Sequence, residues 1–197
     1  MSNLLGASEI REIAERIGVS PTKKLGQNFV IDANTCRKIV NSAEVGSEDI
    51  ALEIGPGLGS LTLALMEKAK AVVAVEIDNR LAAQLSLTAA SHGFDTEKLL
   101  VVNDDALNLK SLPVEPTVLV ANLPYNVSVP VLIRILELFP SIKSGVPSLT
   151  LTKIETSCCH LPSEARSIWR PGYVNSTFLS YNKRNNNLND PSEPFAR

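Results

Sequence analysis

The sequence predicts an α/β fold with a doubly wound, mostly parallel sheet. Apolar runs of strand length alternate with longer segments of helical periodicity, the pattern of parallel strands joined by helical crossovers. The expected strands span residues 50–54, 71–75, 99–102 and 117–121. A glycine-rich turn directly follows the first strand, and polar residues follow the ends of the others. Sheets of this kind bind ligands at the carboxyl ends of their strands, so we expect the functional residues there.

Length and composition indicate a globular chain with one core of ordinary size. Its 197 residues are 44% hydrophobic and 20% charged, which is neither a disordered nor a membrane composition. Charges interrupt every apolar run before the length of a membrane span, and no secretory signal is visible. Cys36, Cys158 and Cys159 have no metal-ligand spacing, and their odd number argues against a disulfide framework. We therefore expect a cytoplasmic protein without membrane contact or metal.

The net charge of −2 does not by itself suggest nucleic acid, which usually selects a basic surface. Residues 1–146 carry 13 Lys and Arg against 17 Asp and Glu, and the remaining residues carry 6 against 4. One local basic group consists of Lys23, Lys24, Arg37 and Lys38. It is either a solvated face or a local RNA patch, and charge alone favours the solvated face.

Helices are expected before and between the strands. Ser8 is expected to cap a first helix that ends at Gly18, and Asp32 is expected to cap a second. Further helices are expected at residues 60–68, 79–90 and 130–139. Pro130 suits the first turn of the last helix, where its missing N–H costs nothing.

The glycine-rich turn is Glu53-Ile54-Gly55-Pro56-Gly57-Leu58-Gly59, and its glycines allow a sharp turn and close backbone approach to a ligand. The next strand ends in Glu76, whose carboxylate suits the two hydroxyls of a ribose, so the pattern predicts a nucleotide site. The G-x-G-x-G spacing with an acid ahead of it resembles the S-adenosylmethionine loop of Rossmann-like methyltransferases. Glu53 suits a ligand with a sulfonium and an ammonium group and suits a pyrophosphate poorly.

A second informative stretch, Asn122-Leu123-Pro124-Tyr125, directly follows the fourth strand. It suits methylation of an exocyclic amine, which is a weak nucleophile because its lone pair delocalises into the ring. The Asn122 side-chain oxygen and the Leu123 carbonyl can accept the two N–H bonds of the amine and fix the line of attack. Pro124 shapes the turn, and Tyr125 offers a stacking face for a base. The alternative is an ordinary strand-end turn.

Five stretches occur in one order along the chain. They are Lys24-Leu25-Gly26-Gln27-Asn28-Phe29, Glu53 to Thr62, Glu76-Ile77-Asp78, Asp105-Ala106 and Asn122 to Ser128. Together they resemble the ribosomal RNA adenine N6,N6-dimethyltransferase family over residues 8–146, in the bacterial small-subunit form of the kasugamycin-resistance type. The resemblance implies a Rossmann-like enzyme that transfers methyl groups from S-adenosylmethionine to the N6 amines of two adjacent adenosines in small-subunit ribosomal RNA.

The resemblance also implies residue roles and a partner. The cofactor-binding residues that it implies are Asn28, Val30, Gly55, Glu76, Asp105 and Asn122. Glu76 would take the ribose hydroxyls, Asp105 would bond the adenine amine, and Asn122 would meet both the cofactor and the target amine. The implied catalytic residues are Asn122, Leu123, Pro124 and Tyr125. The implied partner is the small ribosomal subunit with its RNA, bound by a monomer.

Three other interpretations stay open at this point. Erythromycin-resistance methyltransferases, which act on large-subunit RNA, share most of these motifs. A truncated or non-catalytic module that binds the cofactor or RNA would keep the same fold. A nicotinamide oxidoreductase is disfavoured by the glycine spacing and by the Asn122 stretch.

The chain departs from the family after Val146, so we expect a methyltransferase domain at residues 1–146 and a divergent tail at 147–197. Residues 148–152 alternate and predict one more strand, and the rest of the tail has no period and is expected to be poorly ordered. The family's later strands and its C-terminal helical RNA-binding domain are not recognisable there. With suitable synonymous codons, residues 164–172 read one base later give Pro-Gly-Gln-Tyr-Gly, similar to a family element. A shifted reading frame with weak or absent activity is therefore one hypothesis, which the underlying DNA tests.

Overall fold

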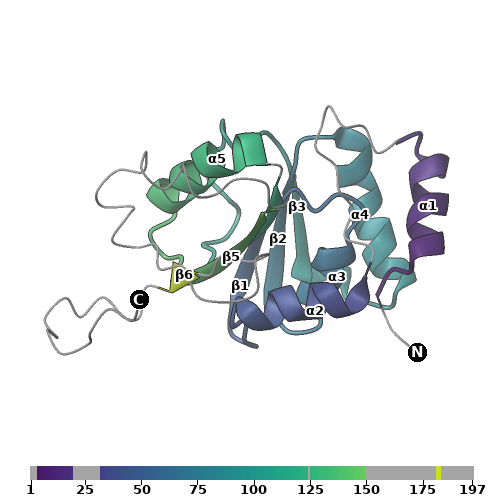
Figure 1. Cartoon of the computed structure of the whole chain (residues 1–197), viewed down its shortest axis with the longest axis horizontal. Coiled ribbons are helices and arrows are strands. Elements are labelled where there is room, and N and C mark those ends of the chain that lie inside the picture. The colour runs from purple at the N-terminus through teal and green to yellow at the C-terminus, as the bar shows by residue number, and fades with distance from the viewer. Residues whose placement is uncertain (1–3, 20–31, 124, 150–180, 183–197) are drawn as a thin grey trace, which may run out of the picture.

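The computed structural model describes residues 4–19, 32–123, 125–149 and 181–182, and Figure 1 shows their arrangement. The α-helices are α1 (Ala7–Arg16), α2 (Ala33–Ser42), α3 (Ser60–Met66), α4 (Asn79–Ser91) and α5 (Tyr125–Leu138), with one 3₁₀ turn, η1 (Thr96–Lys98). The strands are β1 (Ile50–Ile54), β2 (Ala71–Glu76), β3 (Leu99–Asn103), β4 (Val118–Leu123), β5 (Ser144–Leu149) and β6 (Tyr181–Asn182). Every strand expected before residue 146 is present, which confirms the predicted fold class.

The strands form one sheet in the order β3-β2-β1-β4-β5-β6. The first five of these are parallel to their neighbours, and the short β6 is antiparallel to β5. The chain moves outward from β1 to β3 and then returns to place β4 beside β1. The direction of winding therefore reverses between β1 and β4, and ligands of such sheets bind at this switch point.

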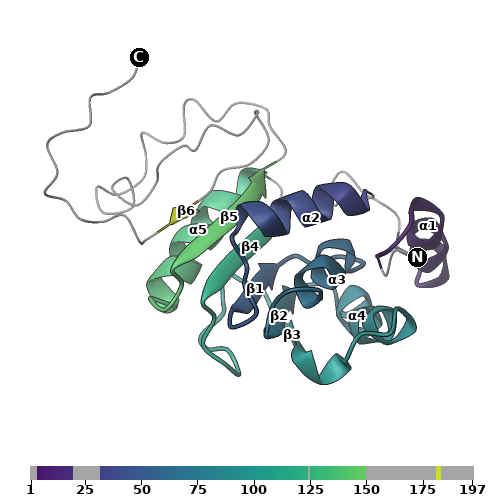
Figure 2. The same cartoon turned by 90° about the horizontal axis from the view of Figure 1, so that it is seen from below.

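Helices cover both faces of the sheet. Figures 1 and 2 show α2, α3 and α4 on one face and α5 on the other. Successive strand side chains point to opposite faces, so β1 contributes Ala51 to the core under α2–α4 and Leu52 to the core under α5. Both faces are therefore buried, which explains why the strands read as continuous apolar runs.

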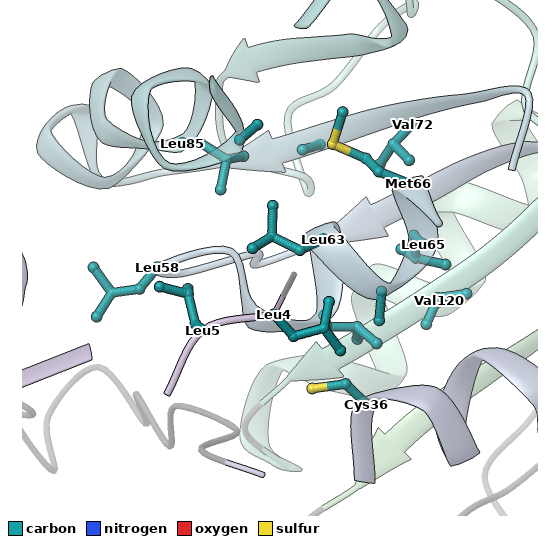
Figure 3. Close-up of a cluster of buried hydrophobic side chains, with 14 of the residues drawn as sticks. Leu4, Leu5, Cys36, Leu58, Leu63, Leu65, Met66, Val72, Leu85 and Val120 are labelled. Carbon is teal, nitrogen blue, oxygen red and sulfur yellow. The ribbon is translucent and has the colours of Figure 1, made fainter. Parts of the chain in front are cut away.

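Helix α3 lies at the centre of the first core, and all of its residues are buried. Figure 3 shows Leu63, Leu65 and Met66 of α3 near Leu85 of α4 and Cys36 of α2. This packing is what fixes the helix immediately behind the glycine-rich turn. The glycine-rich turn is therefore followed directly by a closely packed helix.

The N-terminal helix α1 packs through Ile10, Ile13 and Ala14, which are buried. Its start differs from expectation, because Gly6 holds the cap position and the Ser8 hydroxyl bonds Glu12 instead, at 3.3 Å. The helix begins one residue ahead of Ser8, so Ser8 lies inside its first turn and is placed to bond a residue four positions on. The predicted Ser8 cap is wrong.

The predicted end of α1 and the predicted cap of α2 are confirmed. Gly18 has φ +65°, and its N–H donates to the Glu15 carbonyl at 3.1 Å, as a helix-terminating glycine does. The Asp32 carboxylate accepts the backbone N–H groups of Asn34 and Thr35 at 3.3 and 2.9 Å.

Two predictions near the end of the described chain are corrected. Helix α5 begins at Tyr125, so Pro130 lies inside it and not in its first turn. Burial of Val131, Leu132 and Ile135 against the sheet outweighs the one hydrogen bond that the proline forfeits. Strand β5 begins at Ser144, four residues before the expected residue 148, because its backbone pairs with β4 from there on. Alternation of apolar and polar residues is a poor guide to a strand that is paired in parallel. Residues 150–152 of the expected strand lie outside the described residues.

Strand β5 continues past Val146, and the division of the chain at that residue stays a prediction. Within the described residues, no helix is long and apolar enough to cross a membrane. The same part of the chain contains no group of three or more His, Cys, Asp or Glu placed to hold a metal ion.

Candidate functional site

Polar residues meet in one row at the carboxyl edge of the sheet. Ile54 lies opposite Val75 on one side and Ala121 on the other. The next residue along each segment is therefore at the same level, which aligns Gly55, Glu76 and Asn122. Strand β3 extends the row, because its last residue, Asn103, pairs with Glu76. The predicted gathering of Gly55, Glu76 and Asn122 at this edge is confirmed, and Asp105 follows two residues beyond Asn103.

The glycine-rich turn needs glycine at three positions. Gly55, Gly57 and Gly59 have φ values of +71°, +60° and +99°, a region that other L-residues rarely adopt. The Gly55 N–H donates to the Val75 carbonyl at 2.9 Å, so the start of the turn is fastened to β2. The turn therefore keeps a fixed shape at the switch point between β1 and β4.

Gly59 also meets a steric limit. A Cβ at this position would lie 2.8 Å from Cδ1 of Leu85, which is 1% exposed and packed in the core. The Gly59 carbonyl accepts the N–H of Leu63 at 2.9 Å, the first hydrogen bond of α3. The third glycine therefore lets the helix start close against α4.

We expect Gly59→Ala to lower the free energy of unfolding by about 2–5 kcal/mol, the sum of left-handed strain and overpacking. The matched control is Gly93→Ala, since Gly93 has φ +77° but a Cβ added there would meet nothing within 4 Å. The control should be destabilised by the left-handed strain alone, by about 1–2 kcal/mol. Urea unfolding of the two variants measures the difference, and equal losses would show that contact with Leu85 is unimportant.

Glu76 is the central side chain of the row. It is 4% exposed, and its Oε2 and Oε1 accept the backbone N–H groups of Gly57 and Asp78, each at 3.0 Å. Burial raises the pKa of this carboxyl, while these backbone hydrogen bonds oppose the rise. Glu76 thus fastens the middle of the glycine turn to the end of β2. A carboxylate has about four lone-pair sites, so acceptor capacity remains for a ligand.

Two residues on the β3 side complete the row. The Asn103 amide donates to the backbone carbonyls of Glu76 and Ile77 at 2.7 and 3.3 Å, which steadies the turn after β2. Asp105 accepts the Leu107 N–H at 2.9 Å and the Asn108 amide at 3.0 Å. Sequence reasoning missed Asn103. Its position at the end of a parallel strand was the available signal.

The position of Glu53 ahead of the glycines suggested that its carboxylate contacts a ligand, but the carboxylate is buried in the core. It is 1% exposed, and its Oε2 accepts the Thr62 hydroxyl at 2.7 Å. Burial, with a smaller contribution from the charge of Glu76, raises the pKa of Glu53 to about 8. The carboxyl is therefore mostly protonated at neutral pH, and the expected charge match between Glu53 and a cationic ligand is wrong. The cause is strand alternation, which directs Glu53 into the core under α2 and α3.

Comparison with known proteins now identifies the family. A family model described as ribosomal RNA adenine dimethylase matches residues 19–164. The chain belongs to the ribosomal RNA adenine dimethylase family. A relative from Leifsonia xyli subsp. xyli, named ribosomal RNA small subunit methyltransferase A, is 60% identical over 144 residues, which cover 73% of this chain and 51% of the relative. The chain spans about half the length of the curated relatives it matches.

Two solved structures are similar to this dimethylase-family chain. A dimethyladenosine transferase from Plasmodium falciparum is 30% identical with a TM-score of 0.53, over 60% of this chain and 42% of that one. The 23S rRNA methyltransferase ErmE is 34% identical with a TM-score of 0.55, over 63% of this chain and 48% of that one. Both agree with the doubly wound sheet described above.

Several residues to which the resemblance assigns roles lie at the margin of the described chain or outside it. Asn28, Val30 and Pro124 lie outside the described residues. Asn122 lies in β4 opposite Ser148, and Leu123, which is 8% exposed, lies opposite Leu149. Tyr125 is the first residue of α5. Asn122 and Leu123 thus lie at the end of β4 and Tyr125 lies at the start of α5, at the carboxyl edge, and the roles of these residues stay predictions.

Only part of the basic group Lys23, Lys24, Arg37 and Lys38 lies within the described residues. Lys23 and Lys24 lie outside the described residues. Arg37 forms an ion pair with Glu67 at 2.8 Å, just past the C-terminal end of α3 and thus away from the glycine turn. The charge of Arg37 is therefore balanced within the fold, which favours the solvated-face interpretation for this residue.

Proposed function

We propose that this chain binds S-adenosylmethionine at the carboxyl edge of its sheet and transfers methyl groups to the N6 amines of two adjacent adenosines in small-subunit ribosomal RNA. The observation that carries the proposal is the aligned row of Gly55, Glu76 and Asn122 beside a glycine turn at the switch point. The row brings a close backbone approach, a buried carboxylate and the backbone of Asn122 to one level of the sheet edge.

The residues present fit the cofactor. Glu76 is buried and already oriented by two backbone N–H groups, so it can accept ribose hydroxyls without reorganising. Asp105 would accept the adenine amine, Gly55 would lie against the cofactor, and Asn28 and Val30 would line the rest of the pocket. When bound, the cofactor supplies an electrophilic methyl group. The Glu53 carboxyl stays inside the core and takes no part in contacting it.

The amine would be oriented by residues at the end of β4 and the start of α5. The Asn122 side-chain oxygen and the Leu123 carbonyl would accept its two N–H bonds, and Tyr125 would stack on the base. The higher identity to small-subunit relatives than to the 23S enzyme ErmE supports the small-subunit RNA as substrate. The proposal includes a monomer that works in the cytoplasm, where the subunits are assembled.

The binding part is tested by calorimetric titration of the purified 197-residue chain with S-adenosylhomocysteine, S-adenosylmethionine and NAD. We expect both sulfur cofactors to bind and NAD not to bind. Saturable binding of NAD alone would contradict the proposal.

The transfer part is tested with tritiated S-adenosylmethionine on undermethylated small subunits, with large subunits as the matched control. We expect label at two adjacent adenosines of the small-subunit RNA. Label confined to large-subunit RNA would assign the erythromycin-resistance type of activity instead. Tight cofactor binding with no label on either RNA would show that the chain is a binding module.

A further inference from the structure

Glu53 is a buried acid that the proposed chemistry does not use. It occupies the second-last position of β1, two residues before Gly55, and is 1% exposed. The Thr62 hydroxyl, in the first turn of α3, donates to its Oε2 at 2.7 Å. Thr62 itself is fully buried. A hydrogen bond between two such groups is shielded from water and held in one geometry by the surrounding core.

This hydrogen bond joins the two ends of the glycine turn. The chain leaves β1 after Ile54, makes the turn, and enters α3 at Ser60. The Gly55 and Gly57 N–H groups connect the turn to the neighbouring strand β2, because they donate to the Val75 carbonyl and the Glu76 carboxylate. The Glu53–Thr62 bond instead fixes the separation of the strand end and the helix start. The shape of the turn depends on both kinds of restraint.

The surroundings of Glu53 favour an uncharged carboxyl. Its strand neighbours are Ala74 in β2 and Val120 in β4, which carry no charge. Among the described residues, the ionisable groups facing it are Glu76 at the end of β2 and the Cys36 thiol of α2, whose own pKa is raised to about 12 by burial and by Glu53. A negative charge on Glu53 would therefore lie in the core beside a second carboxylate, with the neutral Thr62 hydroxyl as its hydrogen-bond donor.

We propose that Glu53 is a positioning residue, which in its uncharged form and together with Thr62 holds the turn between β1 and α3 in the shape that the cofactor needs. Ionisation of Glu53 at alkaline pH loosens the turn and weakens cofactor binding. This inference rests on the proposed function, because it concerns the same site.

The sign of the pH effect follows from linkage. The pKa of Glu53 is about 8 in the folded chain and 4.5 for a glutamate in water, so between these pH values the folded chain holds a proton that the unfolded chain has lost. The stabilisation that the raised pKa of Glu53 contributes is complete below pH 4.5. It then decreases as the pH rises to about 8, by up to tenfold in the folding equilibrium constant per pH unit. Glu53→Gln removes this slope, because glutamine has nearly the shape of the protonated acid and does not ionise.

The experiment compares the wild-type chain with Glu53→Gln, Thr62→Val and Thr62→Ser. Urea unfolding is measured at pH 5.5, 6.5 and 7.5, and S-adenosylhomocysteine affinity is measured by calorimetry from pH 6.5 to 9.5. We expect the stability of Glu53→Gln relative to wild type to rise with pH. The affinity ratio of Glu53→Gln to wild type should rise about tenfold from pH 7.5 to 9.5. Taking the ratio cancels titration of the ligand.

The threonine variants separate positioning from folding. Thr62→Ser keeps the hydroxyl and should bind like wild type, while Thr62→Val should bind at least fivefold more weakly at pH 6.5 even when it is fully folded. A constant stability difference and a constant affinity ratio across pH would overturn the inference, as would wild-type affinity in folded Thr62→Val. Absence of ligand binding by the wild-type chain at pH 6.5 would instead overturn the proposed function, and with it the cofactor role of the turn.

Discussion

Glu76→Ala is expected to reduce S-adenosylhomocysteine affinity by about 100-fold or more and to destabilise the fold. The substitution leaves the N–H groups of Gly57 and Asp78, which are half-buried, without their acceptor, at a cost of about 1 kcal/mol each. It also removes the proposed acceptor of the ribose hydroxyls. Calorimetry measures the first effect, and urea unfolding measures the second.

Two controls separate these effects. Glu76→Gln keeps one acceptor oxygen for the turn, so it should lose less stability than the alanine variant while still binding the ligand weakly. Glu48→Ala removes an exposed carboxylate just before β1, at the other end of the strand from the glycine turn, and should change neither quantity. Wild-type affinity in folded Glu76→Ala would contradict the placement of the cofactor.

Asn122→Ala is expected to reduce methyl transfer by at least about 100-fold, the usual cost of removing one oriented hydrogen-bonding group from a transition state. Asn122 shares the row of Gly55 and Glu76 at the end of β4, and by resemblance its side chain orients the target amine. Its backbone pairing in the strand does not depend on the side chain, so the fold should survive. Single-turnover transfer of tritiated methyl to undermethylated small subunits measures the change.

The matched control for this experiment is Asn41→Ala. The Asn41 side-chain oxygen accepts a hydrogen bond from the ammonium of Lys68 at 2.5 Å, beyond the C-terminal end of α3 and away from the proposed site. Its loss should leave transfer at the wild-type rate. Transfer by Asn122→Ala within threefold of wild type, with normal folding, would show that the amine is oriented by other groups.

The sequence by itself determined the strands of the sheet and the edge at which the candidate site lies. Continuous apolar runs such as residues 71–75 are stable as strands only when both faces are covered, and the helices between them supply that cover. Parallel strands end at a common edge of the sheet. Gly55, Glu76 and Asn122 therefore lie side by side once β1 is placed between β2 and β4. The positive φ values at the turn likewise follow from its glycines.

The tertiary structure alone decided how polar groups are paired. Whether Glu53 faces a ligand or the core depends on which face of β1 carries α3, and Thr62, nine residues on, is the partner. Asn103 bonds the end of β2 because the strands are in register, and Pro130 lies inside α5 because apolar contacts with the sheet extend the helix. Strand and helix signals are local in the sequence, whereas burial, charge state and hydrogen-bond partners depend on residues that only folding brings together.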